Sequence, residues 1–185
     1  MKQAIAGVAP PDLEEVTVMA IWPSISSLAG GRAWGRLYGI EAGRGLMPWG
    51  LTVGKLIAFA SIPLILPAYF LLRLPGGGVP GGKLWWSNPL CRHYRLTNRR
   101  LVIEHPLGGA EVRSIALDDF DSVETVVLPG QRWYKSGELV FRKGQIETFR
   151  LSGVPRPETF RRTCLKARNG FVGVSKALKR EAAHA

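Results

Sequence analysis

The sequence predicts a mainly β fold, a small barrel or sandwich closed by a C-terminal helix and preceded by a hydrophobic membrane segment. Three observations predict it. An uncharged apolar run fills the chain between Lys55 and Arg73, short alternating segments separated by turn residues follow Cys91, and helical spacing begins at Pro157. A chain of 185 residues with one membrane segment has room for one domain and some flanking structure.

The N-terminal segment, residues 1–48, is Gly-rich and mixed in character. Val16 to Ile21 alternates as a strand does, and Pro23 stops it. A short interfacial helix is expected further on, although glycines weaken it. Its apolar side consists of Trp34, Leu37, Tyr38 and Ile40, opposite Arg32 and Arg36.

The hydrophobic segment, residues 49–74, contains an uncharged, mostly apolar run of seventeen residues from Leu56 to Leu72. As a helix these span roughly 25 Å, at the short end for a bilayer core of about 30 Å. Pro63 and Pro67 would each cost roughly 3 kcal/mol inside a soluble helix, which disfavours a buried core helix. Three arrangements stay open: one kinked transmembrane helix, a re-entrant hairpin bent at the prolines, and no insertion.

Residues that favour the membrane–water interface flank this run. Tryptophan keeps its N–H wet there, and long cationic side chains reach toward the headgroups. The predicted interface anchors are Trp49, Lys55, Arg73, Trp85 and Trp86. Residues 75–83 are a Gly/Pro linker that holds the following domain close to the membrane.

Residues 84–170 are predicted to form the main domain, with six strands and one helix. Turn residues separate the strands, and Lys143-Gly144 marks a tight hairpin. Thr97-Asn98-Arg99 is expected to form a turn, where asparagine tolerates left-handed backbone angles. The expected strands are 91–96, 100–105, 111–117, 122–128, 138–142 and 145–151.

The closing helix is expected to start at Pro157 and to stop at Asn169-Gly170. Phe160, Cys164, Ala167 and Phe171 fall on one face at helical spacing. Residues 171–185 are predicted to be a loosely held basic tail.

The stretch from Tyr94 to Gly109 resembles the bacterial pleckstrin-homology-like (PH-like) domain of small membrane proteins. That family carries a Tyr-x-Leu-Thr-Asn/Asp-x-Arg-Leu motif, then a glycine turn, then an Ile-x-Leu-x-x-Phe/Ile segment. The matching residues are Tyr94, Leu96, Thr97, Asn98, Arg100 and Leu101, then Gly108 and Gly109, then Ile115, Leu117 and Phe120. The resemblance implies a fold of seven strands and one helix in a membrane setting, and it implies no reaction.

Six strands leave one strand of such a barrel unassigned. We hypothesise that Val16 to Ile21 supplies it. Both flanks of the apolar run would then lie on one side of the membrane, and the run would be re-entrant or surface-bound.

No constellation of residues indicates an enzyme, so we predict no catalytic, metal or cofactor site and no cofactor. The three histidines lack the spacing of metal ligands. Cys91 and Cys164 match no zinc or redox spacing. Asp118, Asp119 and Asp121 cluster at a strand end without the ligand pattern of a calcium loop.

The formal charge is +11, and residues 84–185 carry eighteen Lys or Arg against ten Asp or Glu. A basic domain tied to a membrane suits anionic lipid headgroups on the cytoplasmic side. The candidate contacts are Arg92, Arg95, Arg99 and Arg100 on the first hairpin, and Arg132, Trp133 and Lys135 in a later loop.

We therefore predict a non-enzymatic module at the cell membrane, with its C-terminal domain cytoplasmic, that binds anionic lipid headgroups or a protein partner. The alternative is a structural or assembly subunit of a membrane protein complex. Charge alone would also suit nucleic acid, but the anchor and the lack of stacking aromatic strands disfavour it. The sequence leaves the oligomeric state open.

Overall fold

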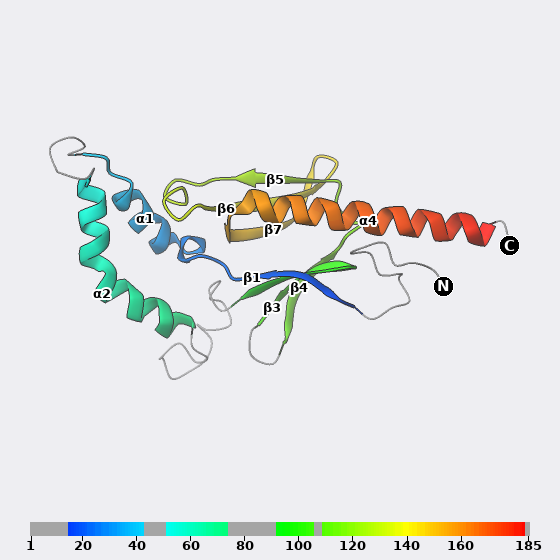
Figure 1. The fold of residues 1–185 in the computed structure, drawn as a ribbon, viewed down its shortest axis with the longest axis horizontal. Helices are drawn as coiled ribbons and strands as arrows, with labels where there is room; N and C mark the ends of the chain where they lie inside the picture. The colour runs from blue at the N-terminus through cyan, green and yellow to red at the C-terminus, as the bar shows by residue number, and fades with distance from the viewer. Residues whose placement is uncertain (1–14, 43–50, 74–91, 106–108, 184–185) are drawn as a thin grey trace.

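The computed structural model describes residues 15–42, 51–73, 92–105 and 109–183 (Figure 1). Within these ranges, seven strands form two antiparallel sheets. The first sheet has the order β1-β2-β3-β4. Its strands are β1 (Thr17–Ile21), β2 (His93–Thr97), β3 (Arg100–Glu104) and β4 (Glu111–Ala116).

The second sheet has the order β5-β6-β7. It consists of β5 (Ser122–Val126), β6 (Ser136–Lys143) and β7 (Ile146–Pro155). The tight turn between β6 and β7 places Gly144 at a φ of +58°, where glycine has no Cβ to clash. The hairpin predicted at Lys143-Gly144 is confirmed.

The hydrophobic core lies between the two sheets and one face of the C-terminal helix. Phe141 is central: its ring packs edge-to-face against Phe120 at 5.0 Å and against Phe149 at 5.9 Å between centroids. The motif residues Tyr94, Leu96, Leu101, Ile115, Leu117 and Phe120 all belong to this core. A PH-like sandwich closed by a helix is therefore confirmed, and its family motif is largely a core motif.

Strand β1 is the seventh strand that the sequence left unassigned. It pairs antiparallel with β2, with Ile21 opposite Tyr94 and Thr17 opposite Thr97. The side chains of Met19 and Ile21 pack against the core. A segment that precedes the hydrophobic helix thus belongs to the same sheet as the strand that follows it.

Asn98 ties the start of β1 to the β2–β3 turn. Its backbone N–H donates to the carbonyl of Val16, and its side-chain Oδ1 accepts from the N–H of Val16, each at 3.0 Å. The turn predicted at Thr97-Asn98-Arg99 is present, and Asn98 is not among the described residues with a positive φ. The turn is held by Thr97, whose Oγ1 accepts from the N–H of Arg100 and donates to its carbonyl.

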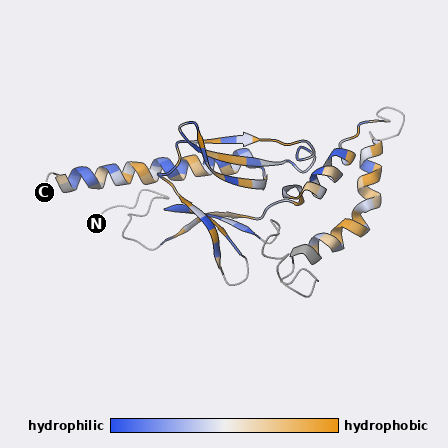
Figure 2. Cartoon of the chain, turned by 180° about the vertical axis from the view of Figure 1, so that it is seen from behind, coloured by the Kyte–Doolittle hydropathy of each residue, from blue (hydrophilic) through white to orange (hydrophobic). Residues whose placement is uncertain are grey.

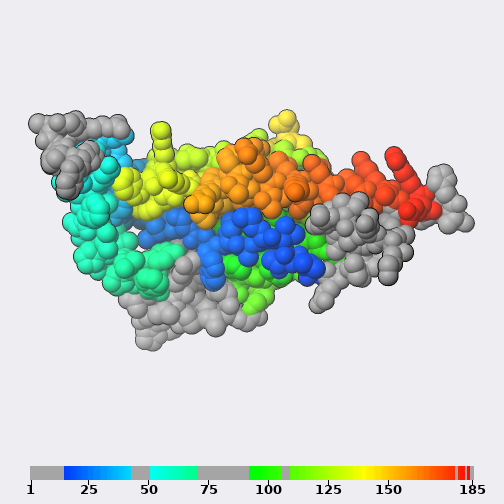
Figure 3. All heavy atoms as spheres, in the orientation of Figure 1, coloured from blue at the N-terminus to red at the C-terminus, as the bar shows by residue number. Residues whose placement is uncertain are grey.

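Between β1 and β2, the described residues include η1 (Ile25–Ser27), α1 (Ala29–Tyr38) and α2 (Val53–Arg73). The short η1 docks on the second sheet, because Ser24 N–H donates to Gly153 O and the hydroxyls of Ser26 and Ser136 lie 2.6 Å apart. Helices α1 and α2 form one end of the molecule, and α4 (Pro157–Ala183) extends toward the other (Figures 1 and 3).

The helix α4 starts at Pro157 as predicted, and the side chains of Phe160 and Cys164 are buried in the core. Its predicted end at Asn169-Gly170 is wrong, because α4 continues to Ala183. Phe171 packs against the core, and the Ala, Leu, Lys, Arg and Glu residues beyond it favour helix. The helix continues despite a cost of about 1 kcal/mol for each of Gly170 and Gly173 in its interior.

We predict that Asn98→Ala lowers the free energy of unfolding by about 1 kcal/mol, because the N–H of Val16 loses its acceptor. Thermal unfolding of the full chain in detergent micelles measures this loss. Asn169→Ala is the control: it lies inside α4, where alanine is the better helix former, and the melting temperature should not fall. Equal melting temperatures for Asn98→Ala and the unmodified chain would contradict the role assigned to Asn98.

Candidate membrane interface

Helix α2 presents an apolar surface to its surroundings. Over Val53–Phe70 its mean hydropathy is 1.7 and only 11% of the residues are buried. Phe59, Leu64 and Phe70 are each more than half exposed, and Figure 2 shows α2 as the most continuous hydrophobic element. In the described part of the chain, it is the one helix long and apolar enough to cross a membrane.

The prolines bend α2 but do not reverse it. Pro63 and Pro67 lie within one uninterrupted helix of 21 residues, so the region is not the hairpin that the sequence left open. Each proline lacks the N–H for the carbonyl four residues earlier, which explains the bend seen in Figure 1. The helix curves toward the body of the molecule.

Helix α1 fixes α2 to the domain. Ser61 Oγ donates to the carbonyl of Ala58, so the 2.5 Å contact between Tyr38 Oη and Ser61 Oγ has tyrosine as the donor. The N–H of Gly54 donates to the carbonyl of Ile40, and a Cβ at Gly54 would lie 2.2 Å from the carbonyl oxygen of Tyr38. The two helices therefore meet through one buried hydroxyl pair and one close backbone approach.

The loop between β5 and β6, residues 127–135, packs on the other side of α1. A Cβ at Gly35 would lie 2.1 Å from the carbonyl oxygen of Gly130, and one at Gly130 would lie 2.0 Å from that of Arg32. The glycines that weaken the predicted helix are thus the residues that let α1 approach this loop. The expected short helix is present, but its side containing Gly31, Gly35 and Tyr38 is buried.

The 127–135 loop has a defined shape of its own. The buried Gln131 accepts from the N–H of Leu128 at 2.9 Å and donates to Glu138 at 3.1 Å. Burial raises the pKa of the Tyr134 hydroxyl to about 12, so it stays neutral at physiological pH. The rings of Trp133 and Tyr38 lie 5.7 Å apart, and both residues line a recess together with Lys55 near the start of α2.

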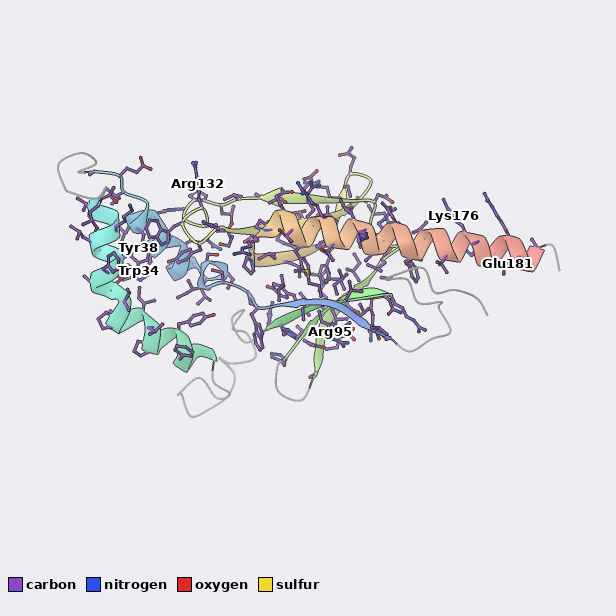
Figure 4. All side chains as sticks on the ribbon, in the orientation of Figure 1. Trp34, Tyr38, Arg95, Arg132, Lys176 and Glu181 are labelled. Atoms are coloured by element: carbon purple, nitrogen blue, oxygen red, sulfur yellow. The ribbon has the colours of Figure 1, made fainter. Side chains whose placement is uncertain are left out.

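The structure brings the predicted loop contacts together with one predicted anchor. Arg132 and Lys135 are exposed, and Trp133 is 38% exposed. With Lys55 of α2 and Arg36 of α1 they line one recess of about 680 Å³ (Figure 4 labels Arg132). Sequence reasoning did not assign Arg36 to this group, because only the fold places α1 beside the loop.

The hairpin cations do not join this group. Arg95 forms a salt bridge with Glu104 at 3.1 Å. Arg100 pairs with Glu15 at 2.9 Å and with Glu111 at 2.7 Å, and its hydrogen bond lowers the pKa of the Glu15 carboxyl. Arg95 lies on the first sheet, away from Arg132 (Figure 4). These arginines have structural ion pairs with carboxylates.

The other candidates have different positions. Arg92 precedes β2, and its buried Nε has no hydrogen-bond partner among the described residues. Arg99 lies in the β2–β3 turn. Arg73 is the last residue of α2, whereas Trp49, Trp85 and Trp86 lie outside the described residues.

Two members of the acidic cluster after β4 are paired with cations. Asp119 contacts Lys143 at 2.7 Å, and Asp121 contacts Arg168 at 3.2 Å. Within the described ranges, no three His, Cys, Asp or Glu side chains are grouped so as to hold a metal ion. Cys164 is buried, and burial raises the pKa of its thiol to about 12.

Residues 51–168 of the sequence match the family described as Bacterial PH domain. The chain belongs to this family. The matched range includes α2 together with β2 to β7, and it starts after β1. No curated protein and no solved structure matches the chain. PH-like domains are in general non-enzymatic binding modules, and membership supports that broad role for this bacterial PH domain.

The packing of α1 on the 127–135 loop gives a paired prediction. Gly35→Ala should lower the free energy of unfolding by about 2 kcal/mol or more, because its Cβ would overlap the Gly130 carbonyl. Gly30→Ala in the same helix meets no atom within 4 Å and should leave stability unchanged or slightly higher. Thermal unfolding of the full chain in micelles compares the two. Equal effects would refute the close approach.

Proposed function

We propose that this bacterial PH domain protein is a membrane-anchored binding module at the cytoplasmic face of the cell membrane. Helix α2 inserts its apolar surface into the bilayer, and the cations beside it bind anionic lipid headgroups. The division into a membrane segment at 49–74, a linker at 75–83 and a domain at 84–170 follows the same proposal, with β1 added to the domain's sheet.

The observation that carries this proposal is the position of the cationic loop. Arg132, Trp133 and Lys135 lie beside the first turns of α2, where Lys55 also lies. A helix embedded in lipid would hold these groups at headgroup level, where an aromatic ring with a polar edge is favoured. The arginines of the first hairpin that form ion pairs, Arg95 and Arg100, do not lie beside α2.

The orientation follows from the charged flanks. Arg36, Arg44 and Lys55 precede the apolar part of α2, and Arg73, Lys83 and Arg92 follow it. Lysine and arginine near membrane segments favour the cytoplasmic side. The anionic cytoplasmic leaflet attracts each such residue by about 1 kcal/mol.

A structural role in a membrane complex is the second candidate. The exposed apolar side chains of α2, such as Phe59 and Leu64, suit helices of another membrane protein as well as lipid. In this case α2 would bind a helix of another membrane protein, and the cationic loop would bind a partner in the complex. The preference for phosphatidylglycerol over phosphatidylcholine distinguishes this role from lipid binding.

We predict that phosphatidylglycerol stabilises the full chain in nonionic detergent micelles more than phosphatidylcholine does, because a ligand that binds the folded state raises its melting temperature. Arg132→Gln with Lys135→Gln should remove about 2 kcal/mol of binding, roughly a 30-fold loss of apparent affinity for phosphatidylglycerol. High salt should reduce the preference.

The matched control is Lys176→Gln with Lys179→Gln, which removes the same charge from exposed positions on α4 at the far end of the molecule. This pair should keep the phosphatidylglycerol preference. Equal stabilisation by the two lipids would count against headgroup binding and favour a protein partner. Equal losses in the two variants would show that net charge, not the loop, determines the preference.

A further inference from the structure

We propose that the groove between α2 and the domain holds one acyl chain of an anionic phospholipid, with the phosphate in the adjoining cationic recess. This inference deepens the proposed function and rests on it. The cationic loop alone would attract an anionic membrane surface without any groove. The groove adds a second claim, that the chain binds one phospholipid molecule at a defined, saturable site.

The groove has a volume of about 580 Å³, within the roughly 300–1,000 Å³ of ligand sites. One side of α2 forms its wall, because positions 55, 58, 62, 65, 66 and 69 recur at helical spacing. Ile25, Tyr38 and Trp133 form the opposite wall. The bend of α2 toward the domain makes this side concave (Figure 1).

The hydroxyls of Tyr38 and Ser61 do not prevent a hydrocarbon chain from lying against this wall, because both are already hydrogen-bonded within the protein. Each hydroxyl has one proton, and both are used: Tyr38 donates to Ser61, and Ser61 donates to the carbonyl of Ala58. Neither hydroxyl therefore offers a donor to a ligand. The neighbouring Ala58, Ile62, Ile65 and Leu66 side chains are apolar. A methylene chain loses no hydrogen bond on entering such a groove.

The adjoining recess has the opposite character. Among the described residues, its lining contains four cationic side chains, Arg36, Lys55, Arg132 and Lys135, and one carboxylate, Glu41. A surplus of cations around a recess favours a phosphate or carboxylate group. The occupant of this half of the site is therefore expected to be an anion.

Three residues join the two halves. Tyr38, Lys55 and Trp133 line both the apolar groove and the cationic recess. A ligand that fills both must have a hydrocarbon part next to an anionic part. The groove opens beside the apolar surface of α2, so the membrane itself supplies such a molecule, an anionic phospholipid.

The test uses the full chain in nonionic detergent micelles, titrated with dioleoyl-phosphatidylglycerol and followed by native mass spectrometry. We expect one saturable lipid adduct per chain. Ala58→Phe places a ring in the groove and should weaken this adduct at least tenfold. Ala60→Phe is the matched control, because Ala60 is exposed and does not line the groove, and its affinity should stay within twofold.

Two results would contradict acyl-chain binding in the groove. One is equal lipid affinity in Ala58→Phe and Ala60→Phe. The other is the absence of a saturable adduct in the unmodified chain, which is the result expected if another segment of the chain fills the groove. Tighter binding of oleate than of phosphatidylglycerol would indicate that the ligand is a free fatty acid, and this would contradict the proposal of a phospholipid.

A second measurement does not depend on how Ala58→Phe folds. One equivalent of phosphatidylglycerol with a diazirine in its acyl chain is photolysed with the unmodified protein. Crosslinks should concentrate at Ile62, Ile65 and Trp133, and crosslinks spread evenly around α2 would contradict the groove. Failure of the groove leaves the loop-dependent phosphatidylglycerol preference intact, whereas failure of the proposed function removes that preference in the unmodified chain.

Discussion

The pairing of β1 with β2 is the constraint on which the rest of the structure depends. β1 precedes the apolar helix in the sequence, β2 follows it, and the two strands are neighbours in one sheet. Asn98 adds hydrogen bonds in both directions between the β2–β3 turn and Val16. The chain therefore leaves the sheet, forms η1, α1 and α2, and returns to the same sheet.

This return limits how α2 meets a bilayer. As a straight helix its 21 residues would span about 32 Å, enough to cross a hydrocarbon core. A full crossing would require residues 74–91 to come back through lipid. That Gly- and Pro-rich stretch is not an apolar helix candidate by sequence, and each unsatisfied backbone group in lipid costs several kcal/mol. If instead both ends of α2 stay on the same side of the membrane and the bent helix is embedded in the lipid from that side, this cost is avoided.

Most of the sheet structure could be predicted from the sequence, because alternation and turn chemistry are local signals. The closing helix was predicted with its start correct and its end wrong, since the contribution of Phe171 to the core is a tertiary contact. The role of Asn98 was missed for the same reason: its partner Val16 lies 82 residues away. A lone asparagine in a turn motif does not reveal whether it bonds locally or to a distant strand.

The candidate site was predicted only in part. Arg132, Trp133 and Lys135 could be identified from composition, but their proximity to Lys55 depends on Gly35 meeting Gly130, which no periodicity signals. Ser61 was the available clue: it is the one serine within the apolar run, and its hydroxyl contacts that of Tyr38. The hairpin arginines looked equivalent in the sequence, and the structure separates them because Arg95 and Arg100 face carboxylates.

The most direct test of the proposed same-side placement is the accessibility of both flanks of α2 in oriented membranes. Single cysteines are introduced by Glu41→Cys and Gly77→Cys in a chain with Cys91→Ser, where the buried Cys164 gives little background. A membrane-impermeant maleimide is applied to intact spheroplasts and to inverted vesicles. Same-side placement predicts that both positions react only in inverted vesicles. Reaction of Gly77→Cys in spheroplasts, with Glu41→Cys reacting only in inverted vesicles, would contradict it.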